Sequence, residues 1–164
     1  MAVKIGINGF GRIGRQILQA GINDPSIEWV AVNDLTDAPT LAHLLKYDSI
    51  HGRMDAKVEA AEGAIGVDGK KIRITAIRNP AELPWKELGV EIVLECTGLF
   101  TDKEKASGHL KAGARKVVIS APAISRATFS RKLMSTEPSG KGGVGTAMNT
   151  TSDLSTPSAV LVVK

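Results

Sequence analysis

Residues 3–14, VKIGINGFGRIG, decide the fold of this chain. The run from Val3 to Ile7 is mostly apolar, which is typical of a buried strand, and the glycine pattern G-x-G-x-x-G follows it directly. A helical pattern of apolar residues begins at Arg12. A strand, a glycine turn and a helix in this order predict the first unit of a parallel sheet that binds a dinucleotide.

Each glycine of the turn has its own predicted role. Gly9 permits the tight turn, Gly11 lets the backbone approach a pyrophosphate, and Gly14 lets the helix pack closely on the strand. Free N–H groups and the positive end of the helix dipole then favour phosphate. The residues predicted to form this cofactor-binding turn are Gly9, Phe10, Gly11, Arg12, Ile13 and Gly14. The alternative is a glycine turn that serves packing alone.

Asp34 carries the second signal. It follows the second predicted strand, about 20 residues after the last glycine, where the dinucleotide fingerprint places the carboxylate that accepts from the ribose hydroxyls. A carboxylate at this point also repels a 2′-phosphate, so the predicted cofactor is NAD rather than NADP. Without the glycines upstream, Asp34 would be interpreted as a solvated acid at a strand end.

The first 123 residues alternate strand and helix patterns, which is typical of an α/β fold. We expect a Rossmann-type parallel sheet with helices on both faces. The predicted strands are 3–7, 28–33, 91–95 and 116–120. The predicted helices are 12–23, one capped by Asp37 with Pro39 in its first turn, and one from a Thr101 or Asp102 cap to Lys111, with Gly113 after its end. The residues expected to face the core are Ile13, Ile17 and Leu18 in the first helix and Leu41, Leu44 and Leu45 in the second.

The segment 56–77 interrupts this alternation. Asp68-Gly69 lies between two short apolar runs, and Asp-Gly is a strong signal for a tight hairpin. We therefore expect a small antiparallel hairpin insertion here.

The composition changes after Ala123. Ser and Thr supply 13 of the 41 residues from 124 to 164. We expect a dinucleotide-binding domain over 1–123 and a Ser/Thr/Gly-rich tail over 124–164, irregular or disordered to 158 and with an added strand at 159–163. Of the formal charge of +4, the tail carries +3. The folded half is therefore nearly neutral, which argues against a nucleic-acid partner.

The sequence also bears on where the protein works. No apolar run approaches the roughly 20 residues that a membrane span requires, and no export signal is visible before Val3. Cys96 is the single cysteine, so an internal disulfide cannot form. We expect a cytoplasmic protein without a membrane partner and, because no Cys or His residues cluster at ligand spacing, without a metal site.

Five segments resemble the phosphorylating glyceraldehyde-3-phosphate dehydrogenase family, in the same order along the chain. They are 4–15 (KIGINGFGRIGR), 32–34 (VND), 47–52 (YDSIHG), 95–100 (ECTGLF) and 118–123 (VISAPA). The resemblance covers about three quarters of the chain. It implies the reaction of that family, the NAD-dependent oxidative phosphorylation of glyceraldehyde 3-phosphate in glycolysis.

The resemblance also implies roles for single residues. Arg12 and Ile13 would line the pyrophosphate, and Asp34 would bind the adenosine ribose. Arg78 falls on the adenine side of the cofactor. Thr97 and Gly98 would border the cofactor at a strand end, and Ser120 would lie near its nicotinamide half.

The same resemblance implies that the catalytic residues are missing. The catalytic cysteine of the family lies beyond the cofactor domain, directly before Thr-Thr, and here Asn149 precedes Thr150-Thr151. Cys96 falls within the cofactor domain and is interpreted as a small buried hydrophobe. The histidines, interpreted as surface or packing residues, are His43, His51 and His109. We therefore expect no catalytic residue in this chain.

The sequence leaves three functions open. The first is an NAD-binding module, truncated relative to the family and inactive alone. The second is dehydrogenase activity that comes from an unusual arrangement, or from assembly with intact subunits of the family; exposed apolar surface would also favour self-association. The third is a non-enzymatic interaction protein that uses the folded half and the basic tail.

Overall fold

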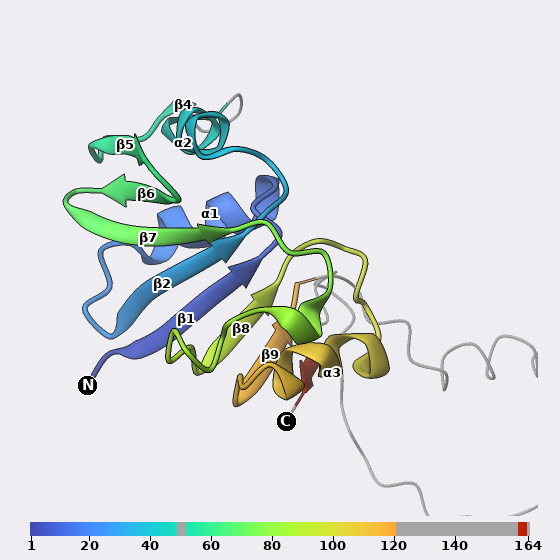
Figure 1. Ribbon diagram of the computed structural model, residues 1–164. Helices are drawn as coiled ribbons and strands as arrows, with labels where there is room; N and C mark the ends of the chain where they lie inside the picture. The colour runs from blue at the N-terminus through green and yellow to red at the C-terminus, as the bar shows by residue number, and fades with distance from the viewer. Residues whose placement is uncertain (49–51, 121–160, 164) are drawn as a thin grey trace, which may run out of the picture.

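Parallel strand pairing organises the molecule around its N-terminal strand. The computed structural model describes residues 1–48, 52–120 and 161–163. Strand β1 (Val3–Asn8) pairs in parallel with β2 (Ile27–Asn33) on one side and β8 (Ile92–Glu95) on the other. Strand β9 (Lys116–Ile119) follows β8, also in parallel. The predicted parallel α/β sheet is therefore confirmed (Figure 1).

Within the described residues, the main sheet has the strand order β10-β9-β8-β1-β2-β7-β6-β5. Strand β6 (Ala64–Val67) pairs antiparallel with β5 (Val58–Ala61) on one side and β7 (Lys70–Thr75) on the other, and β7 also pairs in parallel with β2. The predicted insertion thus extends the main sheet. Its β6–β7 turn is the expected Asp-Gly turn, with φ of 48° at Asp68 and 81° at Gly69.

Two further pairings lie outside this pattern. Strand β10 (Leu161–Val163) pairs antiparallel with β9 and covers that edge of the sheet, which confirms the added strand over those three residues. Strands β3 (Tyr47–Asp48) and β4 (Gly52–Arg53) form a small separate ladder. The predicted domain boundary at residue 123 and the predicted irregular segment 124–158 lie outside the described residues.

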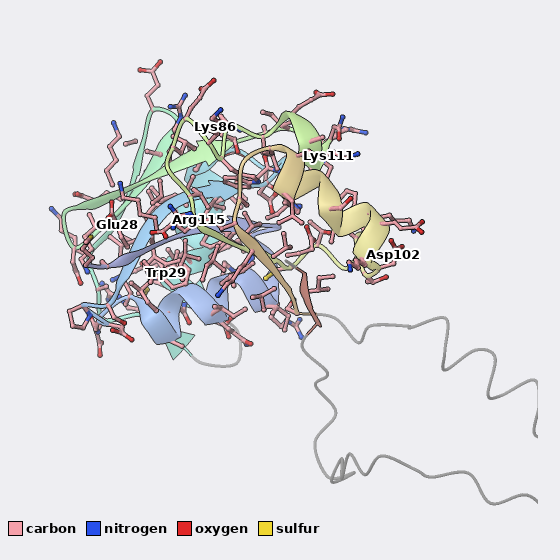
Figure 2. All side chains as sticks on the ribbon, turned by 90° about the horizontal axis from the view of Figure 1, so that it is seen from below. Glu28, Trp29, Lys86, Asp102, Lys111 and Arg115 are labelled. Carbon is pink, nitrogen blue, oxygen red and sulfur yellow. The ribbon has the colours of Figure 1, made fainter. Side chains whose placement is uncertain are left out.

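The helices cover both faces of the sheet, as predicted. Figure 2 shows α1 (Arg12–Gly21) on one side of the strands and α3 (Lys103–Lys111) on the other. Helix α2 (Ala38–Lys46) packs against β5 and β6, and a short 3₁₀ turn, η1 (Pro80–Glu82), packs against α3. None of the helices in these described ranges is long and apolar enough to cross a membrane.

Side-chain caps fix where two helices begin. Asp37 accepts from the backbone N–H of Thr40 at 3.0 Å and caps α2. Asp102, rather than Thr101, accepts from the N–H of Lys105 at 2.8 Å and caps α3. After α3, Gly113 has a φ of 105°, the left-handed conformation expected at a helix end.

Helix α1 ends at Gly21, two residues before the predicted end. Trp29 lies beside α1 (Figure 2), and its indole Nε1 donates to the carbonyl oxygen of Gly21 at 3.1 Å, which satisfies a carbonyl that the helix leaves free. A Cβ built on Gly21 would lie 2.8 Å from the Trp29 ring, so the side chain of Trp29 fits there only against a glycine.

Two of the six residues predicted to face the core are exposed. Ile13 is 46% exposed because the buried stripe of α1 runs through Gly14 and Leu18, one helical step of 100° away. Leu44 is 37% exposed because Ala42 occupies the inward position of α2 beside Leu41 and Leu45. The buried stripe of each helix thus passes through a small residue, Gly14 in α1 and Ala42 in α2.

Candidate functional site

The carboxyl ends of β1, β2 and β8 meet at a cavity of about 440 Å³. Five of the predicted site residues line it: Gly9, Gly11, Asp34, Arg78 and Thr97. Ligands of open parallel sheets bind beyond the carboxyl ends of the strands, and this cavity lies at such an edge. It is the candidate site.

The three glycines of the turn have separate structural roles. Gly9 has a φ of 90°, and a Cβ there would lie 2.7 Å from the backbone nitrogen of Thr97. A Cβ on Gly14 would collide with the carbonyl oxygen of Gly9, so helix and turn touch at this point. A Cβ on Gly11 would meet no atom within 4 Å. Gly11 therefore faces open space at the mouth of the cavity.

Helix α1 begins directly at this open glycine. Gly11 is its N-cap and provides no side-chain hydrogen bond to the first turn. The N–H groups at the start of α1 and the positive end of its dipole therefore face the cavity mouth. Arg12, at the first helical position, is exposed beside them. This arrangement favours an anion such as a phosphate.

Asp34 binds the glycine turn to the end of β2. Its Oδ2 accepts from the backbone N–H of Phe10 at 2.8 Å, and its Oδ1 accepts from the N–H of Thr36 at 3.0 Å. A carboxylate has about four acceptor positions. Asp34 can therefore still accept hydrogen bonds from a ligand hydroxyl in the cavity that it lines.

Cys96 lines the same cavity but is a poor nucleophile. Burial raises the pKa of its thiol, and the nearby charge of Glu95 adds to this, while a hydrogen bond with Ser120 acts in the opposite direction. Cys96 also packs against the main core cluster. The thiolate that covalent catalysis needs is thus disfavoured, as the interpretation of Cys96 as a small hydrophobe implied.

The remaining predicted site residues lie around the cavity rather than in its lining. Phe10 and Gly14 are buried behind the turn, and Ile13 is exposed next to Arg12 at the start of α1. Gly98 follows Thr97 with a φ of 74°. The Oγ of Ser120 donates to the carbonyl oxygen of Glu95 at 3.1 Å, so it lies at the end of β8.

Sequence reasoning missed several residues of the cavity. The apolar side chains of Leu35, Leu99 and Phe100 form part of its wall. Asn8 and Asn33, both buried, form part of its floor. Each of these asparagines closes an apolar strand, and a polar residue at that point was an available signal.

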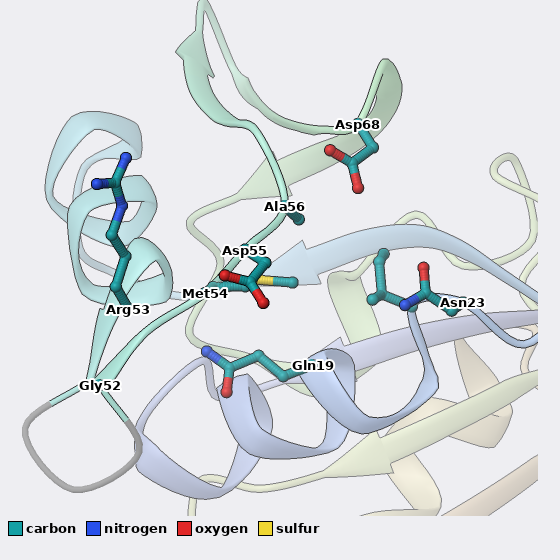
Figure 3. Close-up of a pocket in the computed structure, with 9 residues that line it drawn as sticks. Gln19, Asn23, Gly52, Arg53, Met54, Asp55, Ala56 and Asp68 are labelled. Carbon is teal, nitrogen blue, oxygen red and sulfur yellow. The ribbon is translucent and has the colours of Figure 1, made fainter.

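A second hollow, of about 410 Å³, lies between α1 and the segment that follows β4. Figure 3 shows Gln19 and Asp55 on its walls, with Arg53 pointing away from both. The lining is mostly polar, and it contains none of the predicted site residues. Within the described residues, no group of three or more His, Cys, Asp or Glu side chains could hold a metal ion.

The first cavity lies within the part of the chain that matches known proteins. A family model described as glyceraldehyde 3-phosphate dehydrogenase, NAD binding domain, matches residues 3–103. The glyceraldehyde-3-phosphate dehydrogenase of Geobacillus stearothermophilus is 62% identical over 123 residues, which are 75% of this chain and 37% of that protein. Glyceraldehyde-3-phosphate dehydrogenase 1 of Bacillus subtilis (strain 168) is 59% identical over 123 residues, with the same coverage. The chain thus matches little more than a third of the length of these curated relatives.

Proposed function

This chain belongs to the glyceraldehyde-3-phosphate dehydrogenase family and contains its NAD-binding domain, and we propose that the cavity at the ends of β1, β2 and β8 holds the dinucleotide. The observation that carries the proposal is the glycine turn. Its Gly11 faces open space, while Gly9 and Gly14 are packed so closely that neither has room for a side chain. Such a turn fits a pyrophosphate over the start of a helix.

In this proposal, the backbone of Gly9, Phe10 and Gly11 and the first turn of α1 hold the pyrophosphate. The N–H groups of Arg12 and Ile13 point from the helix start, and the Arg12 guanidinium adds positive charge. Gly14 and the buried side chain of Phe10 fix the shape of the turn through their packing.

The adenosine half lies on the β2 side of the cavity. Asp34 accepts hydrogen bonds from the ribose hydroxyls, and Arg78 lies on the adenine side. Thr97 and Gly98 border the cofactor from the end of β8, and Ser120 lies toward its nicotinamide half. When bound, NAD supplies a hydride acceptor, and the residues of this chain bind and orient it.

We propose further that this chain alone binds NAD without oxidising an aldehyde. Two observations support this: Cys96 is the single cysteine of the sequence, and burial disfavours its thiolate. Participation in the family reaction would then require assembly with intact subunits of related enzymes, because self-association would only bring together copies that lack the thiol. The proposal places the protein in the cytoplasm, where glycolytic NAD is available, and divides it into a domain over 1–123 and a tail over 124–164.

Calorimetric titration of the full chain with NAD and with NADP tests the cofactor assignment. We expect saturable binding of NAD and much weaker binding of NADP, because Asp34 faces the 2′ position. A parallel assay of glyceraldehyde 3-phosphate oxidation at high protein concentration should show no turnover. Absence of NAD binding would refute the proposed function, and turnover by protein freed of host dehydrogenase would refute the proposed lack of activity.

A further inference from the structure

A chain of buried polar side chains runs beneath the proposed NAD site. It begins at the indole of Trp85, passes through His109, Glu95, Asn8 and Asn33, and ends at Thr75 and the backbone of Ile77. Trp85 lies between η1 and β8, His109 lies on α3, and the other side chains come from four neighbouring strands of the sheet, β8, β1, β2 and β7. Glu95 is 1% exposed and His109 is not exposed at all.

The hydrogen-bond partners of His109 define its state. The indole Nε1 of Trp85 can only donate, and it lies 3.0 Å from His109 Nδ1, which must therefore accept. The proton of a neutral ring is then on Nε2, and this nitrogen donates to Glu95 Oε2 at 2.9 Å. In this arrangement His109 fixes the orientation of the Glu95 carboxyl group through that hydrogen bond.

Glu95 is the centre of the chain because four donors converge on it. Its Oε2 accepts from Asn8 Nδ2 at 2.6 Å and from His109 Nε2. Its Oε1 accepts from the backbone N–H of Thr97 at 2.8 Å and from the hydroxyl of the same residue. The two carboxyl oxygens of Glu95 have enough acceptor positions for all four bonds.

Two of these four bonds reach the wall of the cavity directly. They hold Thr97 by its backbone and its side chain, and Thr97 Oγ1 in turn accepts from the N–H of Leu99 at 3.1 Å. The glycine turn packs against this segment, because a Cβ on Gly9 would meet the Thr97 backbone. The rings of His109 and Phe100 also form a T-shaped pair, with centroids 6.4 Å apart. His109 and Glu95 thus support the wall formed by residues 97–100 from behind.

Core stability alone does not account for this arrangement. Well-packed apolar side chains of similar volume usually stabilise a core as well as a buried charged network does. The polar chain also sets the positions of two residues at the site: Asn8, which ends β1, and Thr97, which follows the end of the adjacent strand β8.

We propose that Glu95 and His109 are positioning residues for the NAD site, with Glu95 holding Thr97 and His109 holding Glu95. The inference rests on the proposed function of the cavity. Neither residue touches the cofactor; both act through the wall segment 97–100. Substitution of either residue should therefore lower NAD affinity and speed hydrogen exchange at the Thr97 backbone amide. Both changes should exceed those caused by an equal loss of stability elsewhere in the core.

The test compares four variants of the full chain by calorimetric titration with NAD, thermal unfolding and amide hydrogen exchange. His109→Leu removes both hydrogen bonds and should raise the Kd for NAD about tenfold and expose the Thr97 amide to exchange. His109→Gln can accept from Trp85 and donate to Glu95, so its Kd should stay within about threefold of the original. Glu95→Gln replaces one acceptor oxygen with an NH2 group, which then faces one of the donors around Glu95. This variant should also raise the Kd for NAD about tenfold. Val67→Ala, a core change in β6 outside the cavity lining, is the control for lost stability.

The results separate the two proposals. If Val67→Ala lowers the melting temperature as much as His109→Leu but leaves the Kd and Thr97 exchange unchanged, positioning is supported. Unchanged NAD affinity in both His109→Leu and Glu95→Gln, or equal losses in His109→Gln and His109→Leu, would overturn it. If the original protein does not bind NAD, the proposed function fails. Thr97 exchange would then still decide whether His109 and Glu95 hold the wall.

Discussion

Asp34 accepts a hydrogen bond from the backbone N–H of Phe10, with Oδ2 2.8 Å from the nitrogen, although the two residues are 24 positions apart in the chain. This bond joins the end of β2 to the glycine turn that follows β1. The carboxylate therefore has two separable effects. It shapes the turn through Phe10, and in our proposal it recognises the ribose.

Substitution of Asp34 separates these two effects. Asp34→Asn keeps an oxygen that can accept from Phe10 but removes the charge. NAD affinity should therefore fall about threefold to tenfold, and the ratio of NAD affinity to NADP affinity should decrease. Asp34→Ala also removes the turn contact and should weaken NAD binding about tenfold further. Calorimetric titration of each variant with both cofactors measures these changes. Equal NAD affinities of the two variants would show that the contact with Phe10 does not contribute.

The glycines of the turn offer a matched pair of alanine substitutions. Gly14→Ala places a Cβ against the carbonyl oxygen of Gly9 and should destabilise the protein by about 1–3 kcal/mol. Gly11→Ala places a Cβ in open space, so it should cost less than about 1 kcal/mol of stability yet weaken NAD binding at least about tenfold. Chemical unfolding and NAD titration distinguish the two. Gly11→Ala protein that binds NAD normally would argue against a pyrophosphate at this point.

Much of the fold could be predicted because local signals and tertiary structure agree. The Asp37 cap, the Asp68-Gly69 turn and the glycine pattern each depend on residues close in sequence, and each forms as expected. The misplaced residues have a different cause. Ile13 and Leu44 are apolar and correctly spaced, but in each helix a nearby small residue, Gly14 or Ala42, is buried in their place.

The chain of buried polar side chains beneath the site could not be predicted in this way. His109 has the spacing of a packing residue on α3, and Glu95 resembles an ordinary strand-end acid. Their hydrogen bond joins residues 14 positions apart, and the link from Asn8 to Glu95 spans 87 positions. Only the folded sheet brings them together. A buried acid that follows an apolar strand, with a histidine in the next helix, is the combination that would have suggested this contact.

The cap of α2 should make stability depend on pH in the acid range. Hydrogen bonds from the backbone and hydroxyl of Thr40 hold the pKa of Asp37 below its ordinary value of 3.8. A lowered folded-state pKa means that the contribution is complete above pH 3.8 and is lost as the pH falls through the folded value. Asp37→Ala should therefore unfold at a lower temperature than the original protein at pH 7, and this difference should shrink at lower pH. Asp37→Asn, which caps without titrating, is the control, and a difference that is constant down to pH 2 would contradict the expectation.

The reactivity of Cys96 decides whether this chain carries a usable thiolate. Burial raises the pKa of its thiol above the ordinary value of 9.0, so alkylation by iodoacetamide at pH 8 should be at least about tenfold slower in the folded protein than in the same chain unfolded in guanidinium. NAD should slow the reaction further, because Cys96 lines the proposed cofactor cavity. Mass spectrometry of timed samples measures both rates. A catalytic thiol would behave in the opposite way, reacting faster when folded because the site stabilises its thiolate. A folded rate above the unfolded rate would therefore make Cys96 a candidate nucleophile, and the proposal of NAD binding without aldehyde oxidation would have to be withdrawn.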